Sequence, residues 1–403
     1  MTSATRALWI GTYPHLSGAE GVWRVELDVD PAAGTGSFGG GTLAAASGSP
    51  SFLALDGDTL YAVGETEAGS VSAFAVGPDG ALAPRGGPVA TGGSYPCHVA
   101  VSGDVLVANY GDGVLTVVPT TDDGALDATA SAVGPRRERP AGPGPGAARP
   151  AGARAHFVAP LAHLGAADDG SGAVLVVDLG TDELRRHDPA APDGSTARVV
   201  ATFPPGTGPR HLAALPSGHL VVVGELDPAL FLLSPVDGPD GVRTYDVVAR
   251  YDVTHAAAPA DGGNYPSHVA VTADGTRVLA AVRGADVLAV HAVEPGPDGG
   301  VPTLRHLADS PVGGAWPRHF AILGGATGAE SAAEADQGDA DAPLHDLVVV
   351  ANQNDDPLIE RPAVARPDAP TSNVALLRVR RSDGAAQVLD VLALPAPACV
   401  VEA

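Results

Sequence analysis

Short runs of apolar and β-branched residues recur along the chain, and turn residues separate them. Two examples are "DVLVANYG" at 104–111 and "HLVVVGEL" at 219–226. Apolar spacing of the kind found on one face of a helix is almost absent, and the chain has 52 glycines and 37 prolines. Apolar runs of this length, bounded by turn residues, are typical of β-strands. The pattern therefore predicts an all-β protein.

One motif is repeated in front of these runs: Pro, any residue, His, an apolar residue, Ala. Its six copies start about 45 to 60 residues apart, and they are "SPSFLAL" (49–55), "YPCHVAV" (95–101), "RAHFVAP" (154–160), "GPRHLAAL" (208–215), "YPSHVAV" (265–271) and "WPRHFAIL" (316–323). A β-rich run, a shorter alternating run and a last segment follow each copy, which makes four strands per unit. Four-stranded units at this period indicate the blades of a β-propeller.

A seventh blade is predicted from the two ends of the chain. The N-terminal strands "ALWIGTY", "GVWRVELD" and "GTLAAAS" lack a motif strand, and the C-terminal "PAPACVVEA" can supply it. We therefore expect a seven-bladed β-propeller with four-stranded blades, whose ring is closed by the C-terminal strand, because closure removes an exposed sheet edge. It would form a single domain over 1–403, with irregular insertions at about 134–154, 324–343 and 355–372.

The charge of the chain limits its partners. There are 23 basic and 47 acidic residues, a formal net charge of −24, which repels nucleic acid and anionic membranes. No Lys occurs, so every basic side chain is Arg, whose planar fork suits carboxylate and phosphate groups. No apolar run is long enough to span a membrane, and the N-terminal segment has no apolar core. We expect a cytoplasmic monomer that binds a small anionic substrate, and neither nucleic acid nor a membrane.

We expect no metal and no other cofactor. Cys97 and Cys399 lie far apart in the sequence, and no His-x-His or Cys cluster has the spacing of metal ligands. The glycine clusters lie in turns between strands rather than in a nucleotide-binding loop.

The His of the repeated motif is a candidate structural residue, because a residue found at one place in every blade usually helps to build the blade. These histidines are His98, His156, His211, His268 and His319. The residue before them varies, and it reads Ser51, Cys97, Ala155, Arg210, Ser267 and Arg318. An Arg in only two blades is not explained by the repeat. Since neighbours on a strand point to opposite faces, Arg210 and His211 would have different roles.

A second set of comparable positions follows the second strand of each blade. The pairs there are Gly64-Glu65, Asn109-Tyr110, Asp178-Leu179, Gly224-Glu225, Arg283-Gly284 and Asn352-Gln353. Strand ends on a rigid scaffold are a usual place for a site. Arg forks there could hold an anion while a Glu moves protons. Glu65, Asn109, Tyr110, Asn352 and Gln353 are candidate substrate-binding residues.

The ordered series "LWIGTY", "NYGDGVLTV", "GPRHLAALPSGHLVVVGEL", "YPSHVAVTADG" and "WPRHFAIL…VVVANQN" resembles the seven-bladed lactonase family over essentially the whole chain. That family includes the cycloisomerase-type 6-phosphogluconolactonases and, more distantly, the fungal carboxy-muconate lactonizing enzymes. The resemblance implies an enzyme that opens or closes a lactone ring on an anionic substrate.

The resemblance also implies site residues. They are His156, Arg210, Glu225 and Arg283, to which the repeat adds Arg318 as a substrate-binding candidate. For His156, the repeat indicates a structural role and the resemblance a catalytic one. The chain departs from the family where it reads Arg154-Ala155-His156 instead of His-Ala-His. It also has Gly64 and Gly224 where the family often has Asn.

Three functions remain open at this point. The first is a lactonase for a sugar-acid lactone, 6-phosphogluconolactone above all, with Arg210 stabilising an oxyanion and Glu225 or His156 activating water. The second is a cycloisomerase or lactonase for a carboxylated, muconate-type lactone. The third is a propeller that only binds a ligand or protein, because a fold alone does not imply chemistry.

Overall fold

The computed structural model describes residues 4–13, 21–134, 152–190, 197–238, 240–260, 262–324, 344–354 and 372–403. Within these residues the strands form seven antiparallel sheets, and the helices are three short 3-10 turns, η1 (Leu161–His163), η2 (Gly165–Ala167) and η3 (Pro297–Gly299). The sheets are the predicted blades, and the fold is a seven-bladed β-propeller. The blades group into two compact units, one with three blades and one with four.

The three-blade unit is formed by Met1–Pro50, Val253–Thr327 and Ser331–Ala403. Blade 1 contains β29 (Pro397–Glu402), β1 (Ala4–Thr12), β2 (Gly21–Asp30) and β3 (Thr35–Ala46). Blade 6 contains β21 (Tyr265–Val271), β22 (Arg277–Arg283), β23 (Val287–Glu294) and β24 (Thr303–Pro311). Blade 7 contains β25 (Pro317–Ile322), β26 (His345–Asn352), β27 (Asn373–Arg380) and β28 (Ala386–Ala393).

The four-blade unit is formed by Ser51–Asp252. Blade 2 contains β4 (Leu53–Asp56), β5 (Thr59–Gly64), β6 (Ser70–Val76) and a last strand in two pieces, β7 (Leu82–Pro84) and β8 (Val89–Ala90). Blade 3 contains β9 (Pro96–Ser102), β10 (Asp104–Asn109), β11 (Leu115–Val118) and β12 (Ser131–Val133). Blade 4 contains β13 (Ala155–Pro160), β14 (Val174–Asp178), β15 (Glu183–His187) and β16 (Arg198–Thr202). Blade 5 contains β17 (Pro209–Ala214), β18 (Leu220–Gly224), β19 (Ala229–Asp237) and β20 (Arg243–Asp252).

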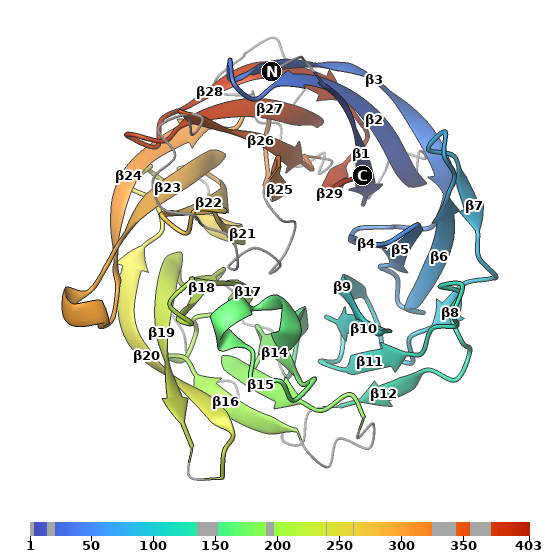
Figure 1. Ribbon diagram of the computed structural model, residues 1–403, viewed down its shortest axis with the longest axis horizontal. Coiled ribbons are helices and arrows are strands. Elements are labelled where there is room, and N and C mark those ends of the chain that lie inside the picture. The colour runs from blue at the N-terminus through green and yellow to red at the C-terminus, as the bar shows by residue number, and fades with distance from the viewer. Residues whose placement is uncertain are drawn as a thin grey trace. The chain divides into compact units, whose positions relative to one another are not determined.

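The C-terminal strand completes blade 1, as the sequence predicts. β29 pairs with β1 from Leu8 opposite Glu402 to Thr12 opposite Pro397, so strands from the two ends of the chain lie side by side (Figure 1). The three predicted insertions fall almost entirely on 135–151, 325–343 and 355–371, which lie outside the described residues. The prediction of a single domain over 1–403 stays a prediction.

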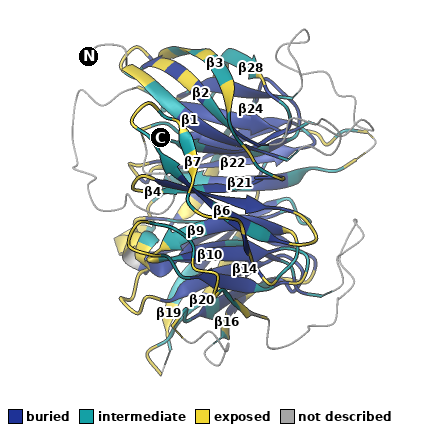
Figure 2. Cartoon of the chain, turned by 90° about the vertical axis from the view of Figure 1, so that its right-hand side faces the viewer, coloured by how far each residue is buried: buried dark blue, intermediate teal, exposed yellow. Residues whose placement is uncertain are grey.

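Burial follows strand position within each blade. The second strands β5, β14, β18 and β22 are buried at every position, which explains why each contains a continuous apolar run. The last strands β3, β20 and β28 carry exposed or half-buried residues at nearly every position (Figure 2). Hydrophobic clusters join neighbouring blades: Val177 of β14 and Val222 of β18 share one cluster with Phe203 and Phe231.

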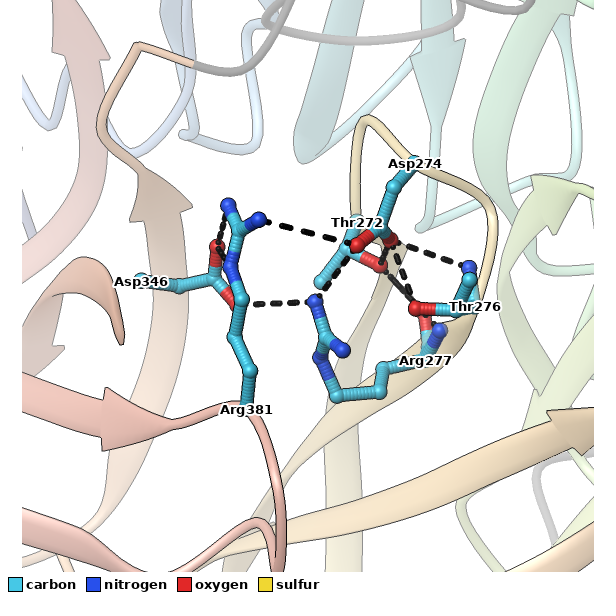
Figure 3. Close-up of polar contacts among 6 residues, drawn as sticks. All are labelled: Thr272, Asp274, Thr276, Arg277, Asp346 and Arg381. Carbon is cyan, nitrogen blue, oxygen red and sulfur yellow. Dashed lines mark hydrogen bonds and ion pairs between the residues drawn. The ribbon is translucent and has the colours of Figure 1, made fainter. Parts of the chain in front are cut away.

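A partly buried charge network joins blades 6 and 7 within the three-blade unit (Figure 3). Arg277 Nη2 lies 2.9 Å from Asp274 Oδ2 and 3.2 Å from Asp346 Oδ2, and Arg381 Nη2 lies 2.7 Å from Asp346 Oδ1. Asp274 Oδ1 accepts hydrogen bonds from the hydroxyls of Thr272 (2.6 Å) and Thr276 (2.8 Å). The two Asp and two Arg balance one another's charge, which makes the burial of Arg277 and Asp346 tolerable.

Candidate active site

In six of the seven blades the first strand carries an extra residue at the same place. In β17, Pro209 pairs with Gly224 and His211 with Val223, which leaves Arg210 opposite no residue of β18. Five other first strands shift register in the same way. Such a β-bulge bends the strand and turns a side chain in a new direction. The bulged residues are Ala398, Cys97, His156, Arg210, Ser267 and Arg318.

This register corrects the alignment of blade 4. Ala155 pairs with Asp178 and Phe157 with Val177, so His156 is the bulged residue and Phe157 takes the place of the repeated His. His156 therefore corresponds to Arg210 and Arg318, not to His211 and His319. The predicted alignment of His156 with the repeated His was wrong, because the segment has no Pro to fix the alignment.

The residues in the place of the repeated His stack on one another. In the four-blade unit, ring centroids are 4.2 Å apart for Phe52 and His98, 4.1 Å for His98 and Phe157, and 4.7 Å for Phe157 and His211. His98 Nδ1 also accepts a hydrogen bond from the backbone N–H of Val158 at 3.4 Å. These contacts join the first strands of neighbouring blades.

The residues in the place of the repeated His also stack on one another in the three-blade unit. His268 and His319 have ring centroids 4.1 Å apart, and His319 Nδ1 accepts from the N–H of Val400 at 3.3 Å. This arrangement fits the structural role predicted for the repeated His.

Small bulged residues also bind the next first strand. The Cys97 thiol donates to the carbonyl of His156 at 3.6 Å, and the Ser267 hydroxyl donates to the carbonyl of Pro317 at 2.6 Å. The bulged residues with long polar side chains are His156, Arg210 and Arg318, and these carry the candidate chemistry.

The same register identifies an equivalent residue at the end of the second strands, the one after the residue that pairs with the motif's Pro. Tyr110 and Glu225 take this place in blades 3 and 5, and Arg283 takes it in blade 6, where Pro266 pairs with Val282. The proposed pairing of Arg283-Gly284 with Gly224-Glu225 was therefore off by one residue. Glu65 takes the place in blade 2 and is 8% exposed.

Asn109 and Asn352 lie one residue before Tyr110 and Gln353, and both belong to the interior of their blades. Asn109 is fully buried, accepts a hydrogen bond from the Thr91 hydroxyl at 2.8 Å and donates to the Thr116 hydroxyl at 3.0 Å. Asn352, also fully buried, donates to Asn373 Oδ1 at 2.9 Å. Their predicted role in substrate binding is not supported, because their amides are used to hold strands together.

Arg210 and Glu225 form the centre of a cluster in the four-blade unit. Arg210 Nε lies 2.8 Å from Glu225 Oε2, and the two side chains are 3% and 20% exposed. Arg210 Nη1 lies 3.5 Å from His211 Nε2, so these neighbours contact each other instead of pointing to opposite faces as predicted. The backbone N–H of Glu225 donates to the Gly208 carbonyl at 2.8 Å, which fixes the start of the carboxylate side chain.

His156 and Tyr110 extend this cluster across blades 4 and 3. The His156 ring lies 5.3 Å from that of His211 and 5.7 Å from that of Tyr110, with the Tyr110 ring edge-on. Burial raises the pKa of Tyr110 and the Glu225 carboxylate raises it further, while Arg154 and Arg210 oppose this effect. The phenol therefore keeps its proton at neutral pH and can donate a hydrogen bond.

A second cluster lies in the three-blade unit. Arg283 is 6% exposed, donates from Nε to the Tyr265 carbonyl at 2.9 Å and stacks over Trp316 with its Cζ 5.3 Å from the ring. Arg318 Nη1 donates to Gln353 Oε1 at 3.2 Å, and its Cζ lies 4.9 Å from the Tyr13 ring. The Gln353 amide donates to the Tyr13 carbonyl at 3.2 Å. Arg318 and Gln353 thus repeat the geometry of Arg210 and Glu225, without a carboxylate.

The sequence prediction missed Tyr13 and Trp316, and treated Arg154 only as a departure from the family. Tyr13 follows β1 at the place of Glu225, because Thr12 pairs with Pro397. Extending the alignment to blade 1 would have found it. Trp316 has a left-handed backbone with φ of 61°, which is uncommon for a bulky residue and invisible in the sequence.

Among the described residues, no group of three or more His, Cys, Asp or Glu side chains has the geometry to hold a metal ion. In the same part of the chain, no helix has the length and apolar character needed to cross a membrane.

A family model described as a lactonase with a seven-bladed β-propeller matches residues 7–326. The match covers more than half of the 403 residues, so the chain belongs to the lactonase family of seven-bladed β-propellers. It is accordingly a hydrolytic enzyme that acts on lactones. The family that the sequence motifs predict is confirmed.

Particular relatives agree with this class. A 6-phosphogluconolactonase of Bacillus subtilis is 29% identical over 322 residues, which are 77% of this chain and 83% of the relative. An uncharacterized protein of Lactococcus lactis is 27% identical over 283 residues, 69% of this chain and 75% of the relative.

Solved structures share the fold. A periplasmic gluconolactonase of Pseudomonas aeruginosa superposes with a TM-score of 0.71 at 23% identity, covering 99% of both chains. A Lactobacillus plantarum protein superposes with a TM-score of 0.71 at 24% identity, covering 99% of this chain and 100% of its own.

Proposed function

We propose that this lactonase hydrolyses 6-phosphogluconolactone to 6-phosphogluconate. The observation that carries the proposal is the Arg210–Glu225 pair, which the bulge of β17 and the end of β18 hold beside His156 and Tyr110. The Bacillus subtilis relative named for this activity supports the choice of substrate. A cytoplasmic location and a monomeric state remain predictions from the sequence.

Hydrolysis needs a base, an oxyanion partner and a proton for the leaving oxygen. Glu225 takes a proton from water as the water oxygen bonds to the lactone carbonyl carbon. Arg210 pairs with the oxyanion that forms, and its rigid position means that little reorganisation is needed. The ring C–O bond then breaks, and the proton on Glu225 passes to the ring oxygen. His156 and the protonated Tyr110 hold the substrate by hydrogen bonds.

The first test is hydrolysis of freshly generated 6-phosphogluconolactone, followed by proton release above the spontaneous rate. Arg210→Ala removes the oxyanion partner and Glu225→Gln removes the base without changing shape, so we expect each to lower kcat by about 10²- to 10³-fold. Arg198→Ala is the matched control, because Arg198 forms an ion pair with Asp240 on exposed surface. Its activity should equal that of the wild type.

A folded wild-type protein without activity on this lactone would contradict the proposed substrate. Carboxylated lactones would then be assayed with the same variants. Normal activity in Glu225→Gln would instead contradict the assignment of the base.

A further inference from the structure

A second guanidinium group lies over Tyr110, the phenol whose pKa Arg210 and Glu225 also affect. Arg154 stands just before β13, and its Cζ lies 5.7 Å from the centroid of the Tyr110 ring. Both Arg154 and Arg210 lower the pKa of Tyr110, whereas Glu225 raises it. Two guanidinium groups and one carboxylate therefore act on the same phenol.

The backbone of Arg154 is held firmly in blade 4. Its N–H donates to Asp178 Oδ1 at 2.9 Å, and its carbonyl accepts from the N–H of Leu179 at 2.9 Å. Asp178 is fully buried and forms an ion pair with Arg185. Residue 180 is Gly because a Cβ there would lie 2.0 Å from the Gly152 carbonyl oxygen and 2.9 Å from Arg154 Cγ. The close approach of these segments fixes where the side chain begins.

The hydrogen bonds of Arg154 occupy one end of its guanidinium group. Nη1 donates to the carbonyls of Gly111 at 2.7 Å and Ala153 at 2.9 Å. Among the residues that the structure describes, Nε and Nη2 donate to no acceptor, and no carboxylate lies within ion-pair distance of the group. These two nitrogens form the edge with which Arg binds two oxygens of a phosphate.

The charges of the cluster do not cancel. Glu225 balances Arg210, which leaves the positive charge of Arg154 in a protein whose formal net charge is −24. The carbonyl of a lactone is neutral, so the hydrolytic step alone does not require this additional charge. A separate anionic group of the substrate would use the positive charge of Arg154.

We infer that Arg154 is a specificity-determining residue that binds the phosphate group of the substrate through its Nε and Nη2 edge. This inference rests on the proposed function, in which Arg210 and Glu225 act on the lactone carbonyl. Arg154 then contributes to binding in the ground state and the transition state alike. Its loss should raise KM and leave kcat nearly unchanged.

The experiment compares two lactones that differ only in the phosphate, 6-phosphogluconolactone and glucono-δ-lactone. Wild type, Arg154→Ala, Arg154→Lys and the surface control Arg198→Ala are assayed with both. Calorimetric titration with 6-phosphogluconate, a stable probe, measures binding without turnover. Circular dichroism and thermal unfolding check that each variant is folded.

For Arg154→Ala we expect a KM for the phosphorylated lactone about 10- to 100-fold higher, with kcat changed by less than about threefold. The KM for glucono-δ-lactone should stay the same, and the Kd for 6-phosphogluconate should rise by the same factor as the KM for the phosphorylated lactone. Arg154→Lys should recover part of the loss, because it restores the charge without the fork.

The inference is overturned if Arg154→Ala raises the KM for both lactones equally or for neither. It is also overturned if the variant binds 6-phosphogluconate with the wild-type Kd. Failure of the proposed function is a different result: the wild type hydrolyses neither lactone. Calorimetry still decides in that case. Tight binding of 6-phosphogluconate that is lost in Arg154→Ala supports the phosphate site, and absence of binding by the wild type overturns it.

Discussion

Gly224 shows how closely the backbone packs behind the proposed base. A Cβ at this position would lie 2.5 Å from the Asp227 carbonyl oxygen and 3.0 Å from a ring carbon of Phe231. Phe231 is fully buried and belongs to the cluster between blades 4 and 5, so it cannot yield easily. The Gly at this place therefore has a local physical reason, and the position of Glu225 depends on it.

Substitution of Gly224 should disturb the site through the backbone. We expect Gly224→Ala to destabilise the fold by about 1 to 3 kcal/mol and to lower kcat about 10-fold, because the chain must shift where Glu225 begins. Urea unfolding and the lactonase assay measure the two effects. Gly87→Ala is the control, since a Cβ at Gly87 meets nothing within 4 Å. Equal behaviour of the two variants would show that Gly224 is replaceable.

At the scale of single residues, the sequence predicted Arg210 and Glu225 as partners in chemistry, and the structure brings them together. It could not place His156, because a bulge leaves no mark in a segment that lacks the motif's Pro. It also could not show that Asn109 and Asn352 are buried, since an amide at a strand end suits a ligand as well as a neighbouring strand.

Between elements, the charge network of Figure 3 connects the β21–β22 turn to blade 7. Burial acts to raise the pKa of Asp274, but hydrogen bonds from Thr272 and Thr276 and the charge of Arg277 lower it to about 2. The folded state thus prefers the ionised carboxylate more strongly than the unfolded state does, whose pKa is near 3.8. The resulting stability is present above pH 4 and is lost as the pH falls toward 2.

This linkage gives a pH-dependent prediction. The wild type should lose about 1 to 2 kcal/mol of unfolding free energy at this site between pH 4 and pH 2, after allowance for solvent screening. Asp274→Asn should remove that part of the slope, as measured by urea unfolding at several pH values. Asp298→Asn, at an exposed position of the same unit, should keep the wild-type slope. An unchanged slope in Asp274→Asn would rule out this contribution.

The strands themselves were predictable, because each blade buries its second strand and so requires an apolar run there. The period of the motif predicted the blades. Its Pro is the first residue of four first strands, β9, β17, β25 and β29, and the second residue of β21. The pairing register between strands was harder to predict from the sequence. Arg283 was paired one residue off, since only the register of β21 with β22 reveals that Val282 faces Pro266.

For the molecule as a whole, blade 1 depends on both ends of the chain. In β29, Cys399 and Val400 are 0% and 2% exposed, and the N–H of Val400 reaches His319 of blade 7. Loss of this strand would expose the edge of β1 together with apolar surface. Removal of only a few C-terminal residues should therefore lower the stability of the fold strongly.

Truncation before Pro397 tests this dependence. We expect a loss of stability above the roughly 0.5 to 3 kcal/mol of an ordinary substitution, together with aggregation through the free edge. Thermal unfolding and size-exclusion chromatography measure these effects, and removal of Ala403 alone is the control. A truncated protein that unfolds at the wild-type temperature would contradict the expectation.

The bulge of the first strands has an evolutionary consequence. Its residue faces no partner in the ladder, so Ser, Cys, His and Arg are all accepted there in one protein without changing how the strands pair. Substrate preference can therefore diverge by single codon changes at a few equivalent positions while the scaffold is inherited intact. A combinatorial library restricted to the bulged positions 156 and 318, which leaves in place the Cys97 and Ser267 side chains that bind the next first strand, would explore new lactone specificities at small risk to folding.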